Sequence, residues 1–261
     1  MLQKNMWKTI RSAGRSSAHG PVRALLDKDM MKKSYPEARY ALVLFLAIFL
    51  LSGCTLMHWF LGEEEEKSPQ ELMRDGVGNL ESGRYKAAVE AFQKIKDRYP
   101  YSKYAVLAEL KMADALYLTK EWDQALEGYR EFEKLHPKHK EIPYVIYQEG
   151  MCFFRQMRSI DREQTHTLKA KQEFERLIRK FPRDEYANRA RRNLRKCYIF
   201  LAEYELYVGN FYYKKGKYRA ALGRYLYLLK HYPDMGQYSR ALEKISKCKE
   251  KIAKEEAKKK G

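Results

Sequence analysis

The feature that most constrains the fold of this 261-residue chain is one spacing of prolines, aromatic residues and small residues that recurs four times. Each unit ends in an aromatic or histidine residue followed by proline. An alanine lies twelve residues before that proline and an aromatic residue eight before it. In three units a further small residue lies twelve residues before the alanine. The prolines are Pro100, Pro137, Pro182 and Pro233, the alanines Ala88, Ala125, Ala170 and Ala221, the aromatic residues Phe92, Tyr129, Phe174 and Tyr225, and the further small residues Gly76, Ala113 and Gly209.

This spacing predicts a repeat of paired helices. Small residues on two facing helices let the helix axes approach closely, and an aromatic ring fills the groove beside them. Proline ends the second helix of each pair because it cannot continue the helical hydrogen-bond ladder. The arrangement resembles the tetratricopeptide pattern of helix, tight turn, helix and proline. We therefore expect an all-α tetratricopeptide-repeat solenoid of about five helix pairs over residues 69–250.

Two irregularities interrupt the repeat. In the third unit Gly150 and Ala170 are 20 residues apart, so eight extra residues are expected within residues 158–168. Residues 186–214 contain few helix breakers and predict one long helix or two nearly continuous ones, and residues 237–260 predict a final amphipathic helix. The expected helix-end residues are Ser68 with Glu71, Ser102 and Thr165 at N-termini and Gly83 at a C-terminus.

Upstream of the repeats, an apolar run ends in Leu51-Ser52-Gly53-Cys54. Positive residues before such a run and small residues directly before the cysteine are typical of a bacterial lipoprotein signal peptide. We expect an unstructured extension at 1–29, which a start codon assigned too far upstream would explain. The other expected segments are a signal peptide at 30–53, a lipidated Cys54 with an acidic linker at 54–68, and a Lys-rich tail at 251–261.

A retained transmembrane helix is the alternative for the apolar run. Residues 40–62 contain no Asp, Glu, Lys or Arg and are long enough to span a bilayer. The small residues before Cys54 favour cleavage instead, because they admit the signal peptidase. Both alternatives export the repeat domain.

A net charge of +18 favours binding to nucleic acid, to an anionic membrane surface or to an acidic protein partner. The sequence contains no helix-turn-helix, zinc-finger or RRM pattern, and an exported chain would not meet cytoplasmic nucleic acid. We therefore expect no nucleic-acid partner. The three later cysteines lie in helical apolar patterns and are expected as small buried side chains. The alternative is one disulfide between two of them. These cysteines are Cys152, Cys197 and Cys248.

No catalytic or metal-binding pattern is present in the sequence. Asp161, Arg162 and His166 lie in the insertion without a nucleophile or a partner acid, so we interpret them as a loop-ordering ion pair and helix cap. His136 and His139 flank a proline turn and lack a third ligand. We expect no enzyme activity, no metal and no cofactor.

Longer motifs indicate one particular family among tetratricopeptide proteins. They are Ile142-Pro143-Tyr144-Val145-Ile146-Tyr147, the insertion Asp161-Arg162-Glu163, and the run Leu201-Ala202-Glu203-Tyr204-Glu205 leading to Tyr212-Tyr213. Together with the cysteine, these motifs resemble the BamD or ComL family of outer-membrane assembly lipoproteins.

The resemblance implies a non-catalytic component of the BAM complex, held on the periplasmic face of the outer membrane through Cys54. The residue after the cysteine is Thr55, whereas an Asp at this position would retain a lipoprotein in the inner membrane. This residue therefore also implies the outer membrane. Its implied partners are the POTRA domains of a BamA-like barrel protein, other BAM lipoproteins and unfolded outer-membrane protein segments. Phe200 departs from the family, because some members have a basic residue there that docks BamA.

Tetratricopeptide solenoids bind peptides on the concave face lined by the first helix of each pair. Aromatic residues and Met suit a surface that must hold many apolar sequences. The alternative is that these side chains pack against neighbouring helices. The candidate partner-binding residues are Tyr117, Tyr144, Tyr147, Met151, Phe154, Asn210 and Tyr213.

Two rival functions fit the same fold. One is a different periplasmic tetratricopeptide lipoprotein that acts as a scaffold in cell-wall or polysaccharide-export machinery. The other is an enzyme-activating partner whose groove holds a regulator's tail.

Overall fold

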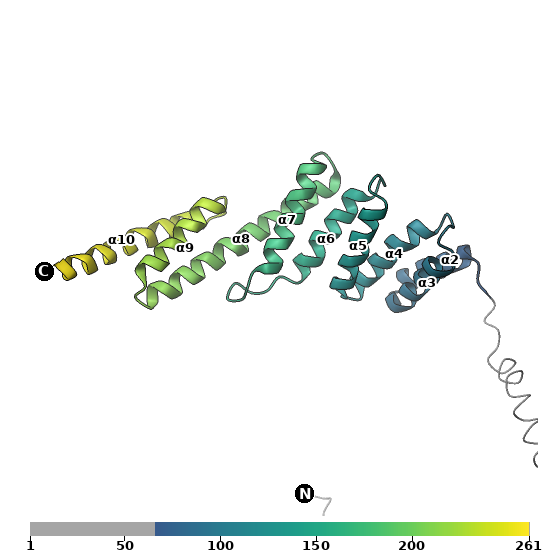
Figure 1. Ribbon diagram of the computed structural model, residues 1–261, viewed down its shortest axis with the longest axis horizontal. Coiled ribbons are helices and arrows are strands. Elements are labelled where there is room, and N and C mark those ends of the chain that lie inside the picture. Colours follow the sequence, from purple (N-terminus) through teal and green to yellow (C-terminus); the bar gives the residue numbers. More distant parts are fainter. Residues whose placement is uncertain (1–65, 261) are drawn as a thin grey trace, which may run out of the picture. The chain divides into compact units, whose positions relative to one another are not determined.

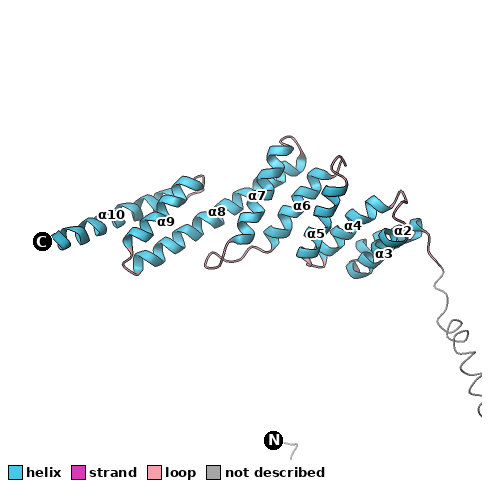
Figure 2. Ribbon diagram, in the orientation of Figure 1, coloured by secondary structure: helices cyan, strands magenta, loops and turns pink. Residues whose placement is uncertain are grey.

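The computed structural model describes residues 66–260. Within this range the elements are helices joined by loops, and no strand occurs (Figure 2). The helices follow one another in a row (Figure 1). They are α2 (Pro69–Glu81), α3 (Tyr85–Arg98), α4 (Ala105–Leu118), α5 (Trp122–Leu135), α6 (Ile142–Arg155), α7 (Thr165–Lys180), α8 (Glu185–Lys214), α9 (Tyr218–His231) and α10 (Tyr238–Lys260).

Each helix packs against the helices before and after it in the chain, and α6 also contacts α8. The pairs α2/α3, α4/α5, α6/α7 and α8/α9 correspond to the four units of the sequence repeat. The expected all-α tetratricopeptide-like fold is confirmed. The proposed signal peptide and Cys54 lie outside the described residues. None of the helices within residues 66–260 is long and apolar enough to cross a membrane.

In three of the four units the aromatic ring of the second helix packs directly on a glycine of the first helix. A Cβ atom added to Gly76 would lie 2.4 Å from Cε1 of Phe92, and one added to Gly150 would lie 2.6 Å from Cε1 of Phe174. At Gly209 the corresponding distance to Tyr225 is 2.4 Å. Glycine is therefore required at these positions, because any side chain would overlap a buried ring.

Three clusters of buried residues form the core. The first joins α2, α3 and α4, the second joins α4 to the first half of α8, and the third joins the second half of α8 to α9 and α10. The 30-residue helix α8 contributes Cys197 to the second cluster and Leu201 to the third. The long helix expected at 186–214 is confirmed as one element that connects two clusters.

Two of the four expected helix-end signals are confirmed. Ser68 caps α2, and Glu71 bonds back to its backbone N–H in a capping box. Gly83 follows α2 with a φ of 73°, in the left-handed region that favours glycine. The expectation for Ser102 is wrong, because residues 99–104 form an extra turn and α4 begins at Ala105 after Tyr104. The expectation for Thr165 is also wrong, because it is the first residue of α7 and Gln164 occupies the cap position.

The three later cysteines are buried and free of disulfides. Burial raises the pKa of Cys152 and that of Cys197 to about 12, so both stay protonated thiols at neutral pH. The expectation of small buried side chains is confirmed.

Candidate functional site

Helices α4, α6 and α8 bring together a set of half-buried aromatic side chains that we call the aromatic face. Each ring keeps part of its surface exposed while the rest packs on the central core cluster. Because the rings are carried by the bodies of packed helices, their positions are fixed more firmly than positions on a loop would be. The aromatic face consists of Tyr117, Tyr144, Tyr147, Phe154 and Tyr186.

One end of the aromatic face is fixed by a carboxylate. Asp114 is 8% exposed and accepts hydrogen bonds from the hydroxyls of Tyr129 at 2.8 Å and Tyr144 at 2.5 Å. Its other oxygen accepts from Nζ of Lys111 at 3.0 Å. Burial, together with the charge of Asp114, raises the pKa of Tyr144 far above its ordinary value. Tyr144 therefore acts as a hydrogen-bond donor at every physiological pH.

The middle of the aromatic face is a continuous set of ring contacts. The ring centroid of Tyr147 lies 5.5 Å from that of Tyr186 and 6.0 Å from that of the buried Phe174. Phe154 contacts Phe174 as well, at the same centroid distance of 6.0 Å. Tyr144 contacts Tyr186 at 5.2 Å. Aromatic pairs at these distances are attractive beyond the area that they bury.

Polar and cationic side chains surround these rings. Nε of Arg155 donates to the hydroxyl of Tyr117 at 2.8 Å, and Nδ2 of Asn193 donates to the hydroxyl of Tyr147 at 3.2 Å. The charged group of Arg189 lies 5.1 Å from the ring centroid of Tyr186, and Nζ of Lys196 lies 6.0 Å from that of Phe154. The three cationic side chains are themselves exposed, so they add positive charge to the border of the aromatic face.

The structure brings together Tyr117, Tyr144, Tyr147 and Phe154, four of the residues expected on the concave face. Met151 lies beneath them, only 9% exposed, and its Sδ receives a contact of 3.1 Å from Nδ2 of Asn193. Most of its surface is therefore closed to a partner.

Asn210 and Tyr213 lie apart from the aromatic face, in the second half of α8. Oδ1 of Asn210 accepts from the hydroxyl of Tyr225 at 2.9 Å. The ring of Tyr213 packs on Tyr218 with centroids 5.2 Å apart, and Nζ of Lys244 lies 5.7 Å from its centre. Tyr213 therefore packs against the cluster of α8, α9 and α10, and Asn210 is bonded to Tyr225 of that cluster.

Sequence reasoning missed Tyr186, Asn193 and Arg155. The first two lie in the half of α8 that the repeat spacing does not cover. Asp184, which caps α8 through the backbone N–H of Tyr186, indicates where that helix begins but not which side chains reach the aromatic face. Arg155 is the last residue of α6, one position beyond the predicted aromatic residues.

The insertion between α6 and α7 is ordered by Gln164. Its Nε2 donates to the carbonyl oxygens of Ser159 at 3.0 Å and Arg162 at 2.9 Å, while its Oε1 accepts from the hydroxyl of Thr167. Asp161 and Arg162 do form an ion pair, at 3.8 Å, but both side chains are exposed and the pair contributes little. His166 contacts the ring of Phe153 at a centroid distance of 6.4 Å. No group of three metal-ligating side chains was found among the described residues.

A buried charge cluster joins α5, α6 and α7. Arg176 donates to Glu149 at 2.7 Å, to Glu133 at 2.8 Å and to Glu173 at 2.7 Å. Glu149 is 1% exposed and its Oε1 has no partner among the described residues. Burial raises the pKa of Glu149 to about 8, because one guanidinium shared among three carboxyl groups compensates it incompletely.

The paired helices and the aromatic face define a tetratricopeptide-like helical-repeat protein. Residues 65–261 match the family described as YfiO, outer membrane lipoprotein. The chain belongs to this family, in agreement with the resemblance, the outer-membrane address and the absence of enzyme activity expected from the sequence.

The similar proteins with established names are outer membrane protein assembly factors called BamD. The chain is 27% identical to that of Vibrio cholerae over 208 residues, which cover 76% of this chain and 85% of the relative. It is 28% identical to that of Neisseria meningitidis serogroup A over 200 residues, covering 73% and 75%. It is 27% identical to that of Pasteurella multocida over 217 residues, covering 79% and 82%.

Among solved structures, the chain is similar to the first TPR domain of human RPAP3, with a TM-score of 0.41 and 20% identity over 52% of this chain and 94% of that domain. It is also similar to a thermophilic TPR protein of Thermus thermophilus, with a TM-score of 0.39 and 20% identity over 68% and 99%.

Proposed function

We propose that this chain is a lipid-anchored assembly factor for outer-membrane β-barrel proteins. The family membership and the name shared by its relatives support this function. The proposed anchor is Cys54, and the proposed complex contains a BamA-like barrel protein, whose POTRA domains the chain binds, and other BAM lipoproteins. In this role the chain holds unfolded barrel segments near the protein that inserts them and performs no chemistry of its own.

The observation that carries the substrate part of the proposal is the aromatic face. Its rings are half-exposed, held on rigid helices and bordered by the exposed cations Arg155, Arg189 and Lys196. A segment rich in aromatic residues would find apolar contact and ring stacking there. A carboxylate on the same segment would be attracted by the cations at the border.

The C-terminal strand of a barrel protein has both features, because it combines aromatic residues with a free terminal carboxylate. We therefore propose that such C-terminal segments bind across the aromatic face. Many related sequences could bind, because the rings provide adaptable apolar contact rather than a single shaped pocket.

Peptide binding tests this substrate assignment. The probe is a fluorescent peptide with the sequence of a barrel protein's C-terminal strand, added to the full chain, with its C-terminally amidated form as ligand control. The double substitution of Arg155→Gln with Lys196→Gln should weaken binding about fivefold or more, because two cations at the border are removed. Amidation should weaken binding by a similar factor.

A matched variant controls for total charge. Lys251 and Lys258 are exposed in α10, a helix that packs on α9 and carries none of the rings of the aromatic face. Replacing both by Gln removes the same charge and should leave the affinity unchanged. Equal weakening by the two double variants would contradict the assignment. Truncating Tyr147 or Phe154 is a poorer test, because both rings pack on the buried Phe174.

A further inference from the structure

A second surface lies at the C-terminal end of the repeat, between α9 and α10. It is a groove with a volume of about 420 Å³, which we call the outer groove. Arg219 and Glu256, which form an ion pair, lie at one end of it. Its other lining residues are Leu222, Gly223 and Leu226 of α9 and Lys249, Ile252 and Ala253 of α10.

The α9 side of the outer groove differs from the same positions in the other three units. Gly223 and Leu226 lie two and five residues after the repeat alanine Ala221. The second helices of the earlier units carry polar residues there, and four of these six residues are exposed. The equivalent residues are Glu90 and Gln93 in α3, Glu127 and Arg130 in α5, and Gln172 and Glu175 in α7.

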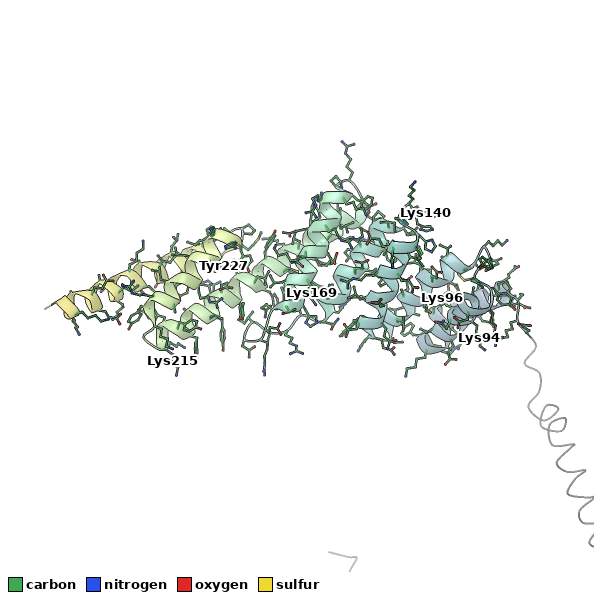
Figure 3. The ribbon with its side chains drawn as sticks, in the orientation of Figure 1. Lys94, Lys96, Lys140, Lys169, Lys215 and Tyr227 are labelled. Carbon is green, nitrogen blue, oxygen red and sulfur yellow. The ribbon has the colours of Figure 1, made fainter. Side chains whose placement is uncertain are left out.

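Two adjacent apolar side chains of α9 are exposed. Leu226 is 47% exposed and Tyr227 is 44% exposed. Tyr227 is labelled in Figure 3. A solvent-facing helix surface that is apolar in one repeat and polar in the others indicates contact with another molecule.

Gly223 has no packing role within the described residues. A Cβ atom added there would meet no atom within 4 Å, whereas Gly76, Gly150 and Gly209 each lie against a ring. Glycine weakens a helix relative to alanine. Gly78 of α2 has the same open space, but Gly223 lies in the middle of an apolar groove. Its missing side chain therefore allows an outside backbone to approach closely.

We propose that the outer groove binds an amphipathic α-helix of a partner protein, with an apolar stripe of small and aliphatic residues and acidic residues beside it. A groove between two packed helices is the site that a third helix fills by ridge-and-groove packing. The acidic flanks follow from charge, because residues 238–260 contain nine Lys or Arg and four Glu, and Lys249 borders the groove in addition to the Arg219–Glu256 ion pair. This surface is separate from the aromatic face and does not depend on the peptide assignment.

Site-specific photo-crosslinking in the native envelope tests the proposal. A benzophenone amino acid replaces Leu226 in the full-length chain, and the matched control carries it at Arg130, the equivalent exposed position of α5. The expected result is an adduct with another protein from position 226 and not from position 130. Mass spectrometry should map the attachment to a helical segment with acidic flanks.

A second variant ties the adduct to the groove. Gly223→Glu places in α9 the residue type that α3 and α5 carry at this position, and the open space beside Gly223 accommodates it. It should lower the adduct yield about tenfold, because it blocks the groove and repels an acidic helix. The thermal unfolding midpoint should stay within about 2 °C.

Four outcomes would overturn the proposal. They are adducts only with a second copy of the chain or only with lipid, attachment to a segment that is not helical or not acidic, no adduct above the control, and an adduct yield that Gly223→Glu leaves unchanged.

Discussion

At the scale of single residues, the type of buried ring in each unit matches the residue that follows the small residue on the first helix. In units two and four the ring is a tyrosine. The residue after the small residue is then Asp114 or Asn210, whose side-chain oxygen accepts a hydrogen bond from the tyrosine hydroxyl. In units one and three the ring is a phenylalanine, and the corresponding residues are Val77 and Met151. The hydroxyl reaches the first helix of its pair and must find an acceptor there, because a buried unpaired hydroxyl is costly.

Phe174→Tyr tests this pairing rule. The ring of Phe174 is fully buried, and a hydroxyl on it would have Met151 in place of an acceptor. We expect a loss of about 1–3 kcal/mol in the free energy of unfolding, measured by chemical denaturation. Adding Met151→Asn should restore a large part of that loss by recreating the Tyr225–Asn210 pair. A double variant no more stable than Phe174→Tyr alone would show that the pairing is coincidental.

Two glycines should respond to alanine with opposite signs. Gly150→Ala places a methyl group 2.6 Å from the Phe174 ring and should destabilise the fold by about 2 kcal/mol or more. Gly223→Ala enters open space and should stabilise it by about 0.5–1 kcal/mol through helix propensity. Both values come from denaturant midpoints, and two changes of the same sign would contradict the packing described here.

At the scale of elements, the buried charge cluster couples three helices. Arg176 of α7 contacts Glu133 of α5 and Glu149 of α6. Although burial opposes it, Arg176 and Lys180 lower the pKa of Glu133, which therefore stays ionised. Glu149 differs because it is more deeply buried and its pKa is raised.

Glu149 should make stability depend on pH. Its pKa of about 8 in the folded chain exceeds its ordinary value of 4.5, so the folded state binds the proton more tightly. This contribution is fully present below pH 4.5 and is lost as the pH rises to about 8. We expect the free energy of unfolding of the native chain to fall over this range by about 1 kcal/mol or more relative to Glu149→Gln. Parallel pH profiles for the two proteins would refute the assignment.

The elements were predictable to different extents. The recurring spacing predicted the paired helices and the insertion, because packed helices impose that spacing on the sequence itself. The starts of α4 and α7 were not predictable, since Ser102 and Thr165 are common capping residues and only the local turn decides where helical hydrogen bonding begins. The insertion is held in one conformation by Gln164, whose side chain bonds to backbone carbonyls. Such partners cannot be predicted from a residue pattern.

At the scale of the whole molecule, the aromatic face is made by three helices that are far apart in sequence. Tyr117 and Phe154 could be predicted, because each lies four residues after the small residue of its unit. Tyr144 and Tyr147 could be predicted because they lie on the same first helix as Phe154. Tyr186 and Asn193 could not, since α8 continues beyond the length of a repeat helix and its register against α6 appears only in three dimensions. The separation of Asn210 and Tyr213 from the aromatic face has the same origin.

The proposed anchor gives a prediction for the whole chain. Cys54→Ser removes the thiol that takes the lipid. Metabolic labelling of cells with radioactive palmitate should therefore label the native chain and not the variant, because the acyl chains are attached at that residue. A native chain without label would favour a retained transmembrane helix at residues 40–62.

The most direct test of the central claim is a pull-down with the full-length chain from detergent-solubilised envelopes, with tagged chain in gentle detergent and mass spectrometry of the bound proteins. An assembly factor is expected to recover a POTRA-bearing barrel protein reproducibly and in amounts comparable to its own. Recovery of cell-wall or polysaccharide-export proteins instead, with no POTRA-bearing protein in repeated experiments, would contradict the account.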